Sequence, residues 1–353
     1  MSQGRAQKTS GTSSDTAFAT DSSSQLSLPG LVADDTEEWV LMDEDTTSER
    51  DRDGRGAFSH VTVLRSEVAT ALTQGREGPS ILVDATLGGG GHTEAILRAA
   101  PHARVIGFDR DEVARASAQA RLSEFGDRLT IVAAPFSRLR EELTKLGIDR
   151  IDGICADLGV SSPQLDEADR GMSFRREGPI DMRMDRSTGE TALDLIARMS
   201  DDELANVIFQ YGEERRSRRI ARSLKRAESA GELVTTLDLR RAIVRAVGPV
   251  RVGGVDPATR TFQALRIAVN DELGELEGLL AQLPEVLTEG GTAAIITFHS
   301  LEDRLVKHAF KSNSAFTPST KKPILPTDEE QAENARSRSA KLRVAVYAHE
   351  EVE

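Results

Sequence analysis

The chain has 353 residues, of which 38% are hydrophobic and only 4% aromatic, and it carries a formal net charge of −13. No stretch approaches the roughly 20 apolar residues that a membrane helix needs, and no apolar segment follows the N-terminus, which argues against a membrane span and a secretory signal. The one cysteine, Cys155, can form no internal disulfide. These features predict a soluble cytoplasmic protein.

Residues 1–57 are rich in Ser, Thr, Asp, Glu and Gly and show no sustained periodicity. They hold 12 acidic and 5 basic side chains, and so account for about seven of the 13 excess negative charges. Such a segment cannot bury enough apolar surface to offset the entropy of ordering it, which predicts a disordered acidic tail. The remaining chain is only mildly acidic, so its charge does not exclude a nucleic-acid partner.

From residue 80 onward, short apolar runs alternate with helical patterns. This order predicts a parallel, doubly wound α/β sheet whose strands all end at one edge. The predicted strands are 81–84, 104–109, 129–132 and 151–157, and the helices between them are 93–100, 111–125 and 137–146.

The alternation stops after residue 160 and returns about one hundred residues later. Residues 162–190 are irregular and 191–248 are helical throughout, whereas a helix over 261–287 and a strand over 292–298 resume the α/β pattern. Residues 342–347 alternate like a closing edge strand. We therefore predict a domain made of residues 58–164 and 261–353, interrupted by a mostly helical lobe at 165–260.

Four glycines, Gly88 to Gly91, follow the first predicted strand, and Asp109 ends the second strand about 20 residues later. A carboxylate at that place accepts both hydroxyls of an adenosine ribose. The dinucleotide fingerprint would need a glycine where the chain has Thr93, and Asp84 at the end of the first strand would repel a pyrophosphate. Because Asp84 suits the charged end of an aminoacyl sulfonium, the pattern favours S-adenosylmethionine over NAD.

Two further side chains lie close to this predicted cofactor site. His92 is placed to contact the ligand, or equally to meet solvent at the start of a helix. Phe136, which follows the third strand, is placed to cover an adenine face or to fill the core.

The fourth strand ends at Asp157, next to the place where this fold holds a transferable methyl group. An exocyclic amine is a poor nucleophile because its lone pair is delocalised into the ring. An acceptor for its N–H bonds localises that pair and orients it, which favours a catalytic role for Asp157 over that of a loop cap.

The fifth strand ends in Phe298-His-Ser-Leu-Glu-Asp-Arg304. Ser300 and Asp303 have the spacing of a helix cap, which leaves His299 as a catalytic candidate that touches the substrate base or phosphate. No His/Cys cluster has the spacing of metal ligands, and neither a Gly-x-Ser-x-Gly elbow nor a Walker loop is present, so no metal is predicted.

The most basic stretch of the chain lies between residues 211 and 226. On a helix its arginines follow i, i+3, i+4, i+7 and i+11 spacing and form a one-sided stripe. Such stripes are often only solvated surface, but in an acidic protein one suits contacts with phosphates. The residues of this stripe are Arg215, Arg218, Arg219, Arg222 and Arg226.

Together these segments resemble the RsmH/MraW family of bacterial methyltransferases over about residues 58–348, in order. The matching segments include Asp84-Ala-Thr-Leu-Gly-Gly-Gly-Gly-His-Thr93, Asp109-Arg-Asp111, Asp157-Leu-Gly-Val-Ser-Ser-Pro-Gln-Leu165, Gly178-Pro-Ile-Asp-Met-Arg-Met-Asp185, Pro257-Ala-Thr-Arg-Thr-Phe-Gln-Ala-Leu-Arg-Ile267 and Phe298-His-Ser-Leu-Glu-Asp-Arg304.

The resemblance implies a Rossmann-like class I methyltransferase fold and S-adenosylmethionine-dependent N4-methylation of a specific cytidine in 16S ribosomal RNA, on the assembled small subunit. It implies that the lobe at 165–260 engages the RNA, and it leaves monomer and homodimer both open. The acidic tail is not part of the family core, and the residue that stacks on the target base is not identified. The cofactor contacts that it implies are Gly90, Gly91, His92, Asp109, Phe136, Asp157 and Gln164.

Overall fold

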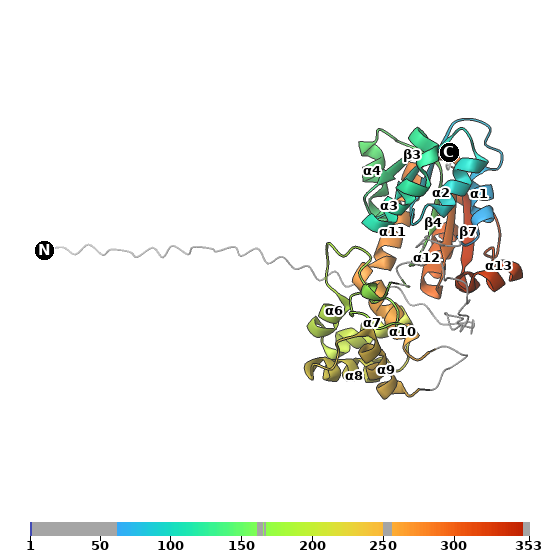
Figure 1. The fold of residues 1–353 in the computed structure, drawn as a ribbon. Helices are drawn as coiled ribbons and strands as arrows, with labels where there is room; N and C mark the ends of the chain where they lie inside the picture. Colours follow the sequence, from blue (N-terminus) through green and yellow to red (C-terminus); the bar gives the residue numbers. More distant parts are fainter. Residues whose placement is uncertain (2–61, 161–164, 166, 250–255, 349–353) are drawn as a thin grey trace. The chain divides into compact units, whose positions relative to one another are not determined.

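The computed structural model describes Met1 and residues 62–160, 165, 167–249 and 256–348, so the predicted tail at 1–57 lies, apart from Met1, outside the described residues. Seven strands within the described ranges form one sheet in the order β3-β2-β1-β4-β5-β7-β6 (Figure 1). Their bounds are β1 Ser80–Asp84, β2 Ala103–Phe108, β3 Leu129–Val132, β4 Ile151–Asp157, β5 Leu287–Thr297, β6 Phe316–Pro318 and β7 Lys341–Tyr347.

Strands β1 to β5 are all parallel, so their carboxyl ends meet at one edge of the sheet, as predicted. Strand β7 is antiparallel and pairs with β5 on one side and β6 on the other. The prediction that residues 342–347 close the sheet as an edge strand is therefore wrong. The edge is β6, whose three residues are too short to give a recognisable alternating pattern.

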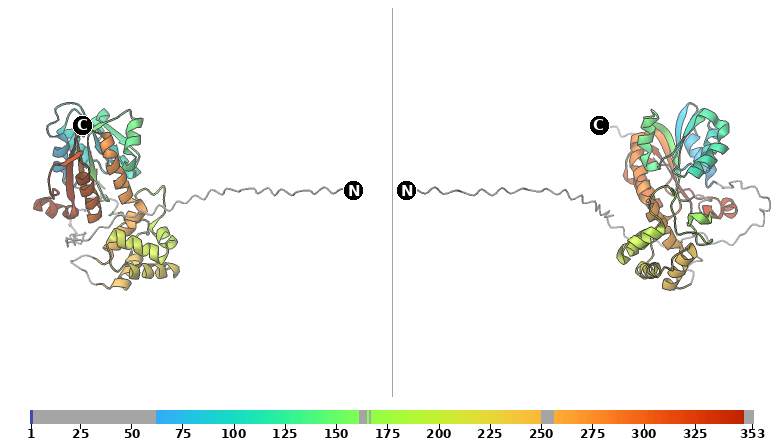
Figure 2. Two further views of the ribbon diagram at one scale, coloured as in Figure 1. Left: turned by 180° about the vertical axis from the view of Figure 1, so that it is seen from behind. Right: turned by 60° about the vertical axis from the view of Figure 1, so that its left-hand side comes forward.

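The sheet is covered on both faces, which explains why its strands read as continuous apolar runs (Figure 2). Successive residues of a strand belong to different apolar clusters. Val83 of β1 and Ile106 of β2 belong to one cluster, whereas the residues before them, Leu82 and Val105, belong to another. Six helices of the sheet domain are α1 Arg65–Thr73, α2 Gly91–Ala99, α3 Glu112–Arg121, α4 Leu139–Lys145, α11 Glu272–Val286 and α12 Ser300–Ser312.

Several helix ends differ from the predicted ones. The helix predicted over 111–125 ends as α3 at Arg121 and continues as a 3-10 segment, Ser123–Arg128. The helix predicted over 137–146 begins with a 3-10 turn, Phe136–Arg138. Shorter elements elsewhere are the 3-10 segments Ala168–Arg170 and Ala335–Ser339 and the helix α13 Asp328–Glu333.

The single helix predicted over 261–287 is two helices, α10 (Thr259–Asn270) and α11, separated at Asp271. Asp271 has a φ of 49°, a left-handed conformation that interrupts an α-helix and that Asp tolerates better than most residues. The preceding Asn270 accepts a hydrogen bond from Met184 N and donates one to Met182 O. The break therefore lets Asn270 hold the 182–184 segment.

Five helices pack around a separate apolar cluster that includes Ile196, Ile208, Leu224 and Ile243. Three of them, α6, α7 and α9, begin with a capping box, in which a Thr or Ser accepts from the third backbone N–H of the helix. These helices are α6 Ala192–Arg198, α7 Asp201–Gly212, α8 Ser217–Ser229, α9 Thr236–Val247 and α10. No helix in the described ranges combines the length and the apolar character needed to cross a membrane.

Polar contacts fasten the helical cluster to the carboxyl edge of the sheet. Arg170 forms an ion pair of 2.7 Å with Asp111, and both side chains are buried. Farther along the same edge, Glu213 at the end of α7 accepts a hydrogen bond from Ser300 at the start of α12. The helices are thus held beside the edge where the predicted site residues gather.

Candidate active site

The glycine loop between β1 and α2 needs its glycines for two reasons. Gly88 and Gly90 have positive φ angles of 49° and 79°, which side chains other than glycine rarely adopt. A Cβ at Gly90 would lie 2.7 Å from Leu122 Cδ1, and one at Gly91 would lie 1.8 Å from Thr62 Oγ1. The chain can therefore pass this close to its neighbours only without side chains.

Asp84 stabilises the two ends of this loop through hydrogen bonds. It is buried, its Oδ2 accepts from Thr93 Oγ1 at 2.7 Å, and its Oδ1 accepts from Thr86 N at 3.2 Å. Burial raises the pKa of Asp84 above its ordinary value, against the opposing effects of His92 and these hydrogen bonds. Asp84 and Gly90 do not line the cavity described below, so direct contact of either with a cofactor stays a prediction.

Asp109 lies at the end of β2 and accepts hydrogen bonds from two backbone amides. Its Oδ2 accepts from Gly88 N and its Oδ1 from Asp111 N, each at 2.8 Å. Burial raises the pKa of Asp109 to about 6, although both hydrogen bonds lower it. Each carboxylate oxygen keeps a second lone pair, so the group can still accept two hydroxyl donors.

His92 and Asp157 bring the start of α2 and the end of β4 together. His92 Nε2 lies 3.5 Å from Asp157 Oδ2. Both imidazole nitrogens of His92 and Oδ1 of Asp157 are buried without a hydrogen-bond partner among the described residues. An unsatisfied buried polar atom costs about 1–3 kcal/mol, so these three atoms make this place a candidate ligand site.

One cavity of about 480 Å³ connects these side chains. A ligand pocket of a few hundred Å³ that combines apolar walls with a few polar groups is typical of small-molecule sites. The predicted residue Gln164 lies outside the described residues. Lining side chains from the sheet domain include His92, Asp109, Phe136, Asp157, Phe298 and His299, and those from the helical cluster and its connections include Met172, Phe174, Met184 and Phe262.

His299 follows β5 and is itself the N-cap of α12. Its Nδ1 accepts from Glu302 N at 3.4 Å, and Glu302 Oε2 accepts in return from His299 N at 3.3 Å. The predicted Ser300–Asp303 cap is therefore wrong by one residue. Ser300 donates to Glu213, and Asp303 instead pairs with Arg343.

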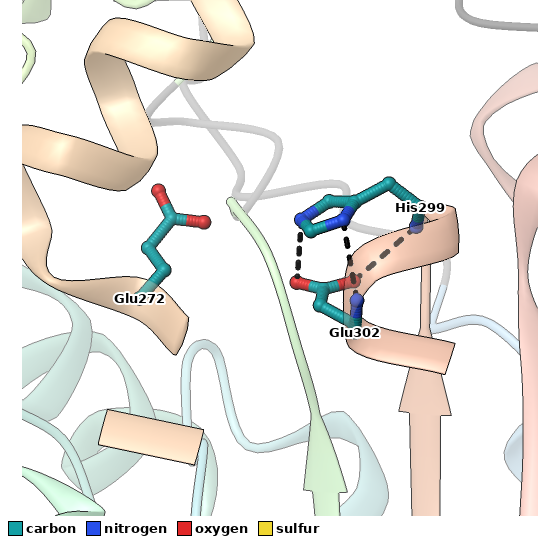
Figure 3. Close-up of side chains that lie close together, drawn as sticks. All are labelled: Glu272, His299 and Glu302. Atoms are coloured by element: carbon teal, nitrogen blue, oxygen red, sulfur yellow. Dashed lines mark hydrogen bonds and ion pairs between the residues drawn. The ribbon is translucent and has the colours of Figure 1, made fainter. Parts of the chain in front are cut away.

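Glu302 belongs to a buried charged cluster that residue spacing did not reveal (Figure 3). Arg266 donates to both carboxylate oxygens of Glu272, at 2.7 and 2.8 Å. Burial alone raises the pKa of Glu302, but His299, the Phe298 amide and Arg266 together hold it below its ordinary value. Glu272, His299 and Glu302 also bring three potential metal-ligating atoms within 4.8 Å of one another.

The arginine stripe lies on and just before α8, with Ile220 and Leu224 buried on the opposite side. Its members are exposed, and no carboxylate of the described residues forms an ion pair with them, whereas the adjacent Arg216 pairs with Glu214. Arg219 and Arg222 also line a second hollow of about 370 Å³ with Arg226 and Arg245.

The strand order, with an antiparallel β7 between β5 and β6, defines the Rossmann-like class I methyltransferase fold, as predicted. The glycine loop after β1 and the acidic residue after β2 occupy the positions expected in that fold. The sequence model of the MraW methylase family matches residues 57–347, and the chain belongs to this family.

Relatives with curated names cover most of the chain. A ribosomal RNA small subunit methyltransferase H from Sorangium cellulosum is 61% identical over 81% of this chain and 90% of its own length. A protein of the same name from Methylobacterium nodulans is 46% identical over 82% of this chain and 90% of its own length. Among solved structures, an rRNA methylase from Streptococcus thermophilus is 12% identical, with a TM-score of 0.38 over 81% of this chain and 94% of its own.

Proposed function

We propose that this methyltransferase moves a methyl group from S-adenosylmethionine to N4 of a cytidine in 16S ribosomal RNA, on the assembled small subunit. The names of the curated relatives support a small-subunit ribosomal RNA substrate. One observation carries the proposal for the site: a single cavity contains Asp109, which suits an adenosine, and Asp157, which suits an amine.

The residues at one end of the cavity fit S-adenosylmethionine. Asp109 has acceptor capacity for the two ribose hydroxyls, and Phe136 lines the same cavity, where it can cover the adenine. The unsatisfied imidazole nitrogens of His92 offer hydrogen bonds to the polar amino-acid end of the ligand. When bound, S-adenosylmethionine supplies an electrophilic methyl group.

Asp157 makes the amine reactive by accepting a hydrogen bond from one of its N–H groups, and it would take up that proton as the nitrogen gains the methyl group. Oδ1 is buried and free to accept, while Oδ2 faces His92 at 3.5 Å. Such a hydrogen bond turns the nitrogen lone pair out of conjugation with the ring and toward the methyl group, and a positioned proton acceptor of this kind is worth about 10²–10⁴-fold. The backbone N–H of Asp157 donates to Thr86 Oγ1 and so fixes the strand end.

The apolar part of the cavity fits a base that has left its stack. Phe174 and Phe262 meet edge to face, with ring centroids 5.1 Å apart, and Phe298 lines the same cavity. An enzyme that modifies a base must extrude it, and an apolar pocket excludes water from the reacting atoms.

The arginine stripe on α8 supports contact with the RNA backbone. Unneutralised arginines on one face of an acidic protein bind phosphates through charge-assisted hydrogen bonds. We therefore assign Arg215, Arg218, Arg219 and Arg222 to the RNA-binding surface.

Two measurements test the proposal. The full chain should bind S-adenosylhomocysteine in a calorimeter and transfer radiolabelled methyl groups to small subunits isolated from cells that lack the protein. Mass spectrometry of the product nucleosides should then find N4-methylcytidine. Binding without transfer would instead indicate an RNA-binding protein that has kept a cofactor pocket, and a response to NADH would indicate a dehydrogenase.

A further inference from the structure

The charged cluster at the end of β5 has a use beyond capping α12. Glu272, His299, Glu302 and Arg266 all line the cavity, yet the His299 and Glu302 side chains are only 2% and 3% exposed. Nε2 of His299 has no hydrogen-bond partner among the described residues, although it lies 3.2 Å from Glu302 Oε1. In Figure 3 the Nε2 edge of the ring faces the space between Glu302 and Glu272.

The capping hydrogen bond of α12 shows which ring nitrogen of His299 carries the proton. Because Nδ1 accepts from the Glu302 backbone N–H, its lone pair must point at that amide. A neutral imidazole carries one proton, which then belongs to Nε2. Nε2–H is therefore a buried donor that lies 3.2 Å from Glu302 Oε1 and can still donate to a ligand in the cavity.

The same assignment argues against a metal ion in the cluster. A metal ion would bind the Nε2 lone pair and so move the ring proton to Nδ1. Two donors, Nδ1–H and the backbone N–H of Glu302, would then face each other. The cluster also has its own cation. Although burial alone lowers the pKa of Arg266, Glu272 and Glu302 together hold it above its ordinary value. Arg266 thus offsets one of the two carboxylate charges.

Resting on the proposed function, we propose that His299 Nε2–H recognises N3 of the target cytosine. Cytosine presents this acceptor beside its amine donor, whereas uracil presents a donor at N3 and an acceptor at O4. One N–H donor with a buried carboxylate beside it complements N3 and the amine of cytosine, whereas uracil would set its N3–H against the donor and its O4 against the carboxylate. The cluster is therefore a specificity site for the base.

Glu302 and Arg266 act through His299 as positioning residues. The Glu302 carboxylate is fixed by the backbone N–H groups of Phe298 and His299, at 2.8 and 3.3 Å. Arg266 stabilises that charge and is itself fixed by Glu272. The imidazole thus meets the base in one tautomer and one orientation.

Two variants separate recognition of the base from capping of the helix. In His299→Asn the shorter amide can take the place of Nδ1 and keep the cap, since Asn is among the best N-cap residues, but it cannot reach the place of Nε2. In His299→Gln the longer amide nitrogen can reach the Nε2 position, while the cap is weakened. Methyl transfer by the full chain to unmodified small subunits is measured for both, with melting temperature and S-adenosylhomocysteine affinity.

We expect kcat/KM of His299→Asn to fall about 10²-fold, because a buried acceptor is left unpaired, with melting temperature and cofactor affinity unchanged. His299→Gln should recover most of the rate while melting at a lower temperature. Wild-type kcat/KM in His299→Asn, or a Gln variant slower than the Asn variant, would overturn the inference but leave methyl transfer intact. Failure of the wild-type chain to methylate subunits would overturn the proposed function instead.

The metal content of the same proteins gives an independent check. Elemental analysis should find no stoichiometric zinc or manganese in the wild-type chain. One metal ion per wild-type chain that is missing from His299→Asn would overturn the tautomer and, with it, the assignment of Nε2–H as donor.

Discussion

His92 Nε2 lies 3.5 Å from Asp157 Oδ2, and this contact joins the end of the glycine loop to the carboxyl edge of the sheet. His92 comes from the first turn of α2, which begins at Gly91, whereas Asp157 ends β4. A substitution at either residue is therefore expected to affect both cofactor binding and methyl transfer. Effects on turnover and on cofactor affinity have to be measured separately.

Asp157→Ala should slow methyl transfer about 10²–10⁴-fold while leaving S-adenosylhomocysteine binding weakened but measurable. The variant removes the acceptor that orients the amine, an effect of about 10²–10⁴-fold, but it leaves Asp109 and the loop in place. Single-turnover transfer to small subunits and calorimetry with S-adenosylhomocysteine give the two quantities. Unchanged turnover would refute the role assigned to Asp157.

Cofactor affinity should weaken as the pH falls below about 6, the pKa to which burial raises Asp109. The ribose hydroxyls donate to a carboxylate, so the ligand prefers the ionised form, and below this pKa the free protein holds a proton that binding must release. At pH 5 the dissociation constant of S-adenosylhomocysteine should be roughly tenfold higher than at pH 7.5. Titrations across this range measure it.

Asp109→Asn is the matched control for that experiment. At pH 7.5 this variant should bind S-adenosylhomocysteine more weakly than the wild type. Its affinity should not change between pH 7.5 and pH 5, because the titrating group is gone. An equal decline in the variant would assign the pH effect to another group or to the ligand itself.

Local patterns predicted the sheet well because each buried strand is an apolar run with polar residues at its end. Asp84, Asp109 and Asp157 could be placed at one edge since parallel strands share their direction. The three-residue β6 was too short for such a pattern, and so β7 was mistaken for the edge. The break at Asp271 was hidden because the apolar spacing continues through it.

The cluster behind His299 could not be predicted from spacing. Arg266 and Glu272 belong to α10 and α11 and meet Glu302 only after the chain has folded. The cap was misplaced because Ser300 is a common N-cap residue and histidine is not. A Glu three residues after His299 was the available signal.

Reversing two charges of the arginine stripe, Arg218→Glu with Arg222→Glu, should weaken binding to small subunits and leave cofactor affinity unchanged. Neither arginine has a carboxylate partner among the described residues, so the change breaks no ion pair there. Losing two phosphate contacts should lower the slope of log affinity against log salt by about 2. Filter binding of subunits over a range of salt concentrations measures both quantities.

Lys307→Glu with Lys311→Glu is the control for this variant. These exposed lysines have the same i, i+4 spacing on α12 and reverse the same total charge. If they weaken subunit binding as much as the arginine pair does, net charge rather than the α8 surface governs binding. Loss of cofactor affinity in the arginine variant would instead show that the stripe supports the fold.

Gly90→Ala should damage the cofactor loop through backbone strain and overlap together. The φ of 79° costs a side chain about 1–2 kcal/mol, and the new Cβ would also lie 2.7 Å from Leu122 Cδ1. Gly231→Ala has a similar φ of 69° but meets nothing within 4 Å, so it isolates the strain. Both variants should melt at a lower temperature, but only Gly90→Ala should lose S-adenosylhomocysteine affinity, because only that loop forms the site. Equal affinities in the two variants would mean that the loop adapts and does not hold the cofactor.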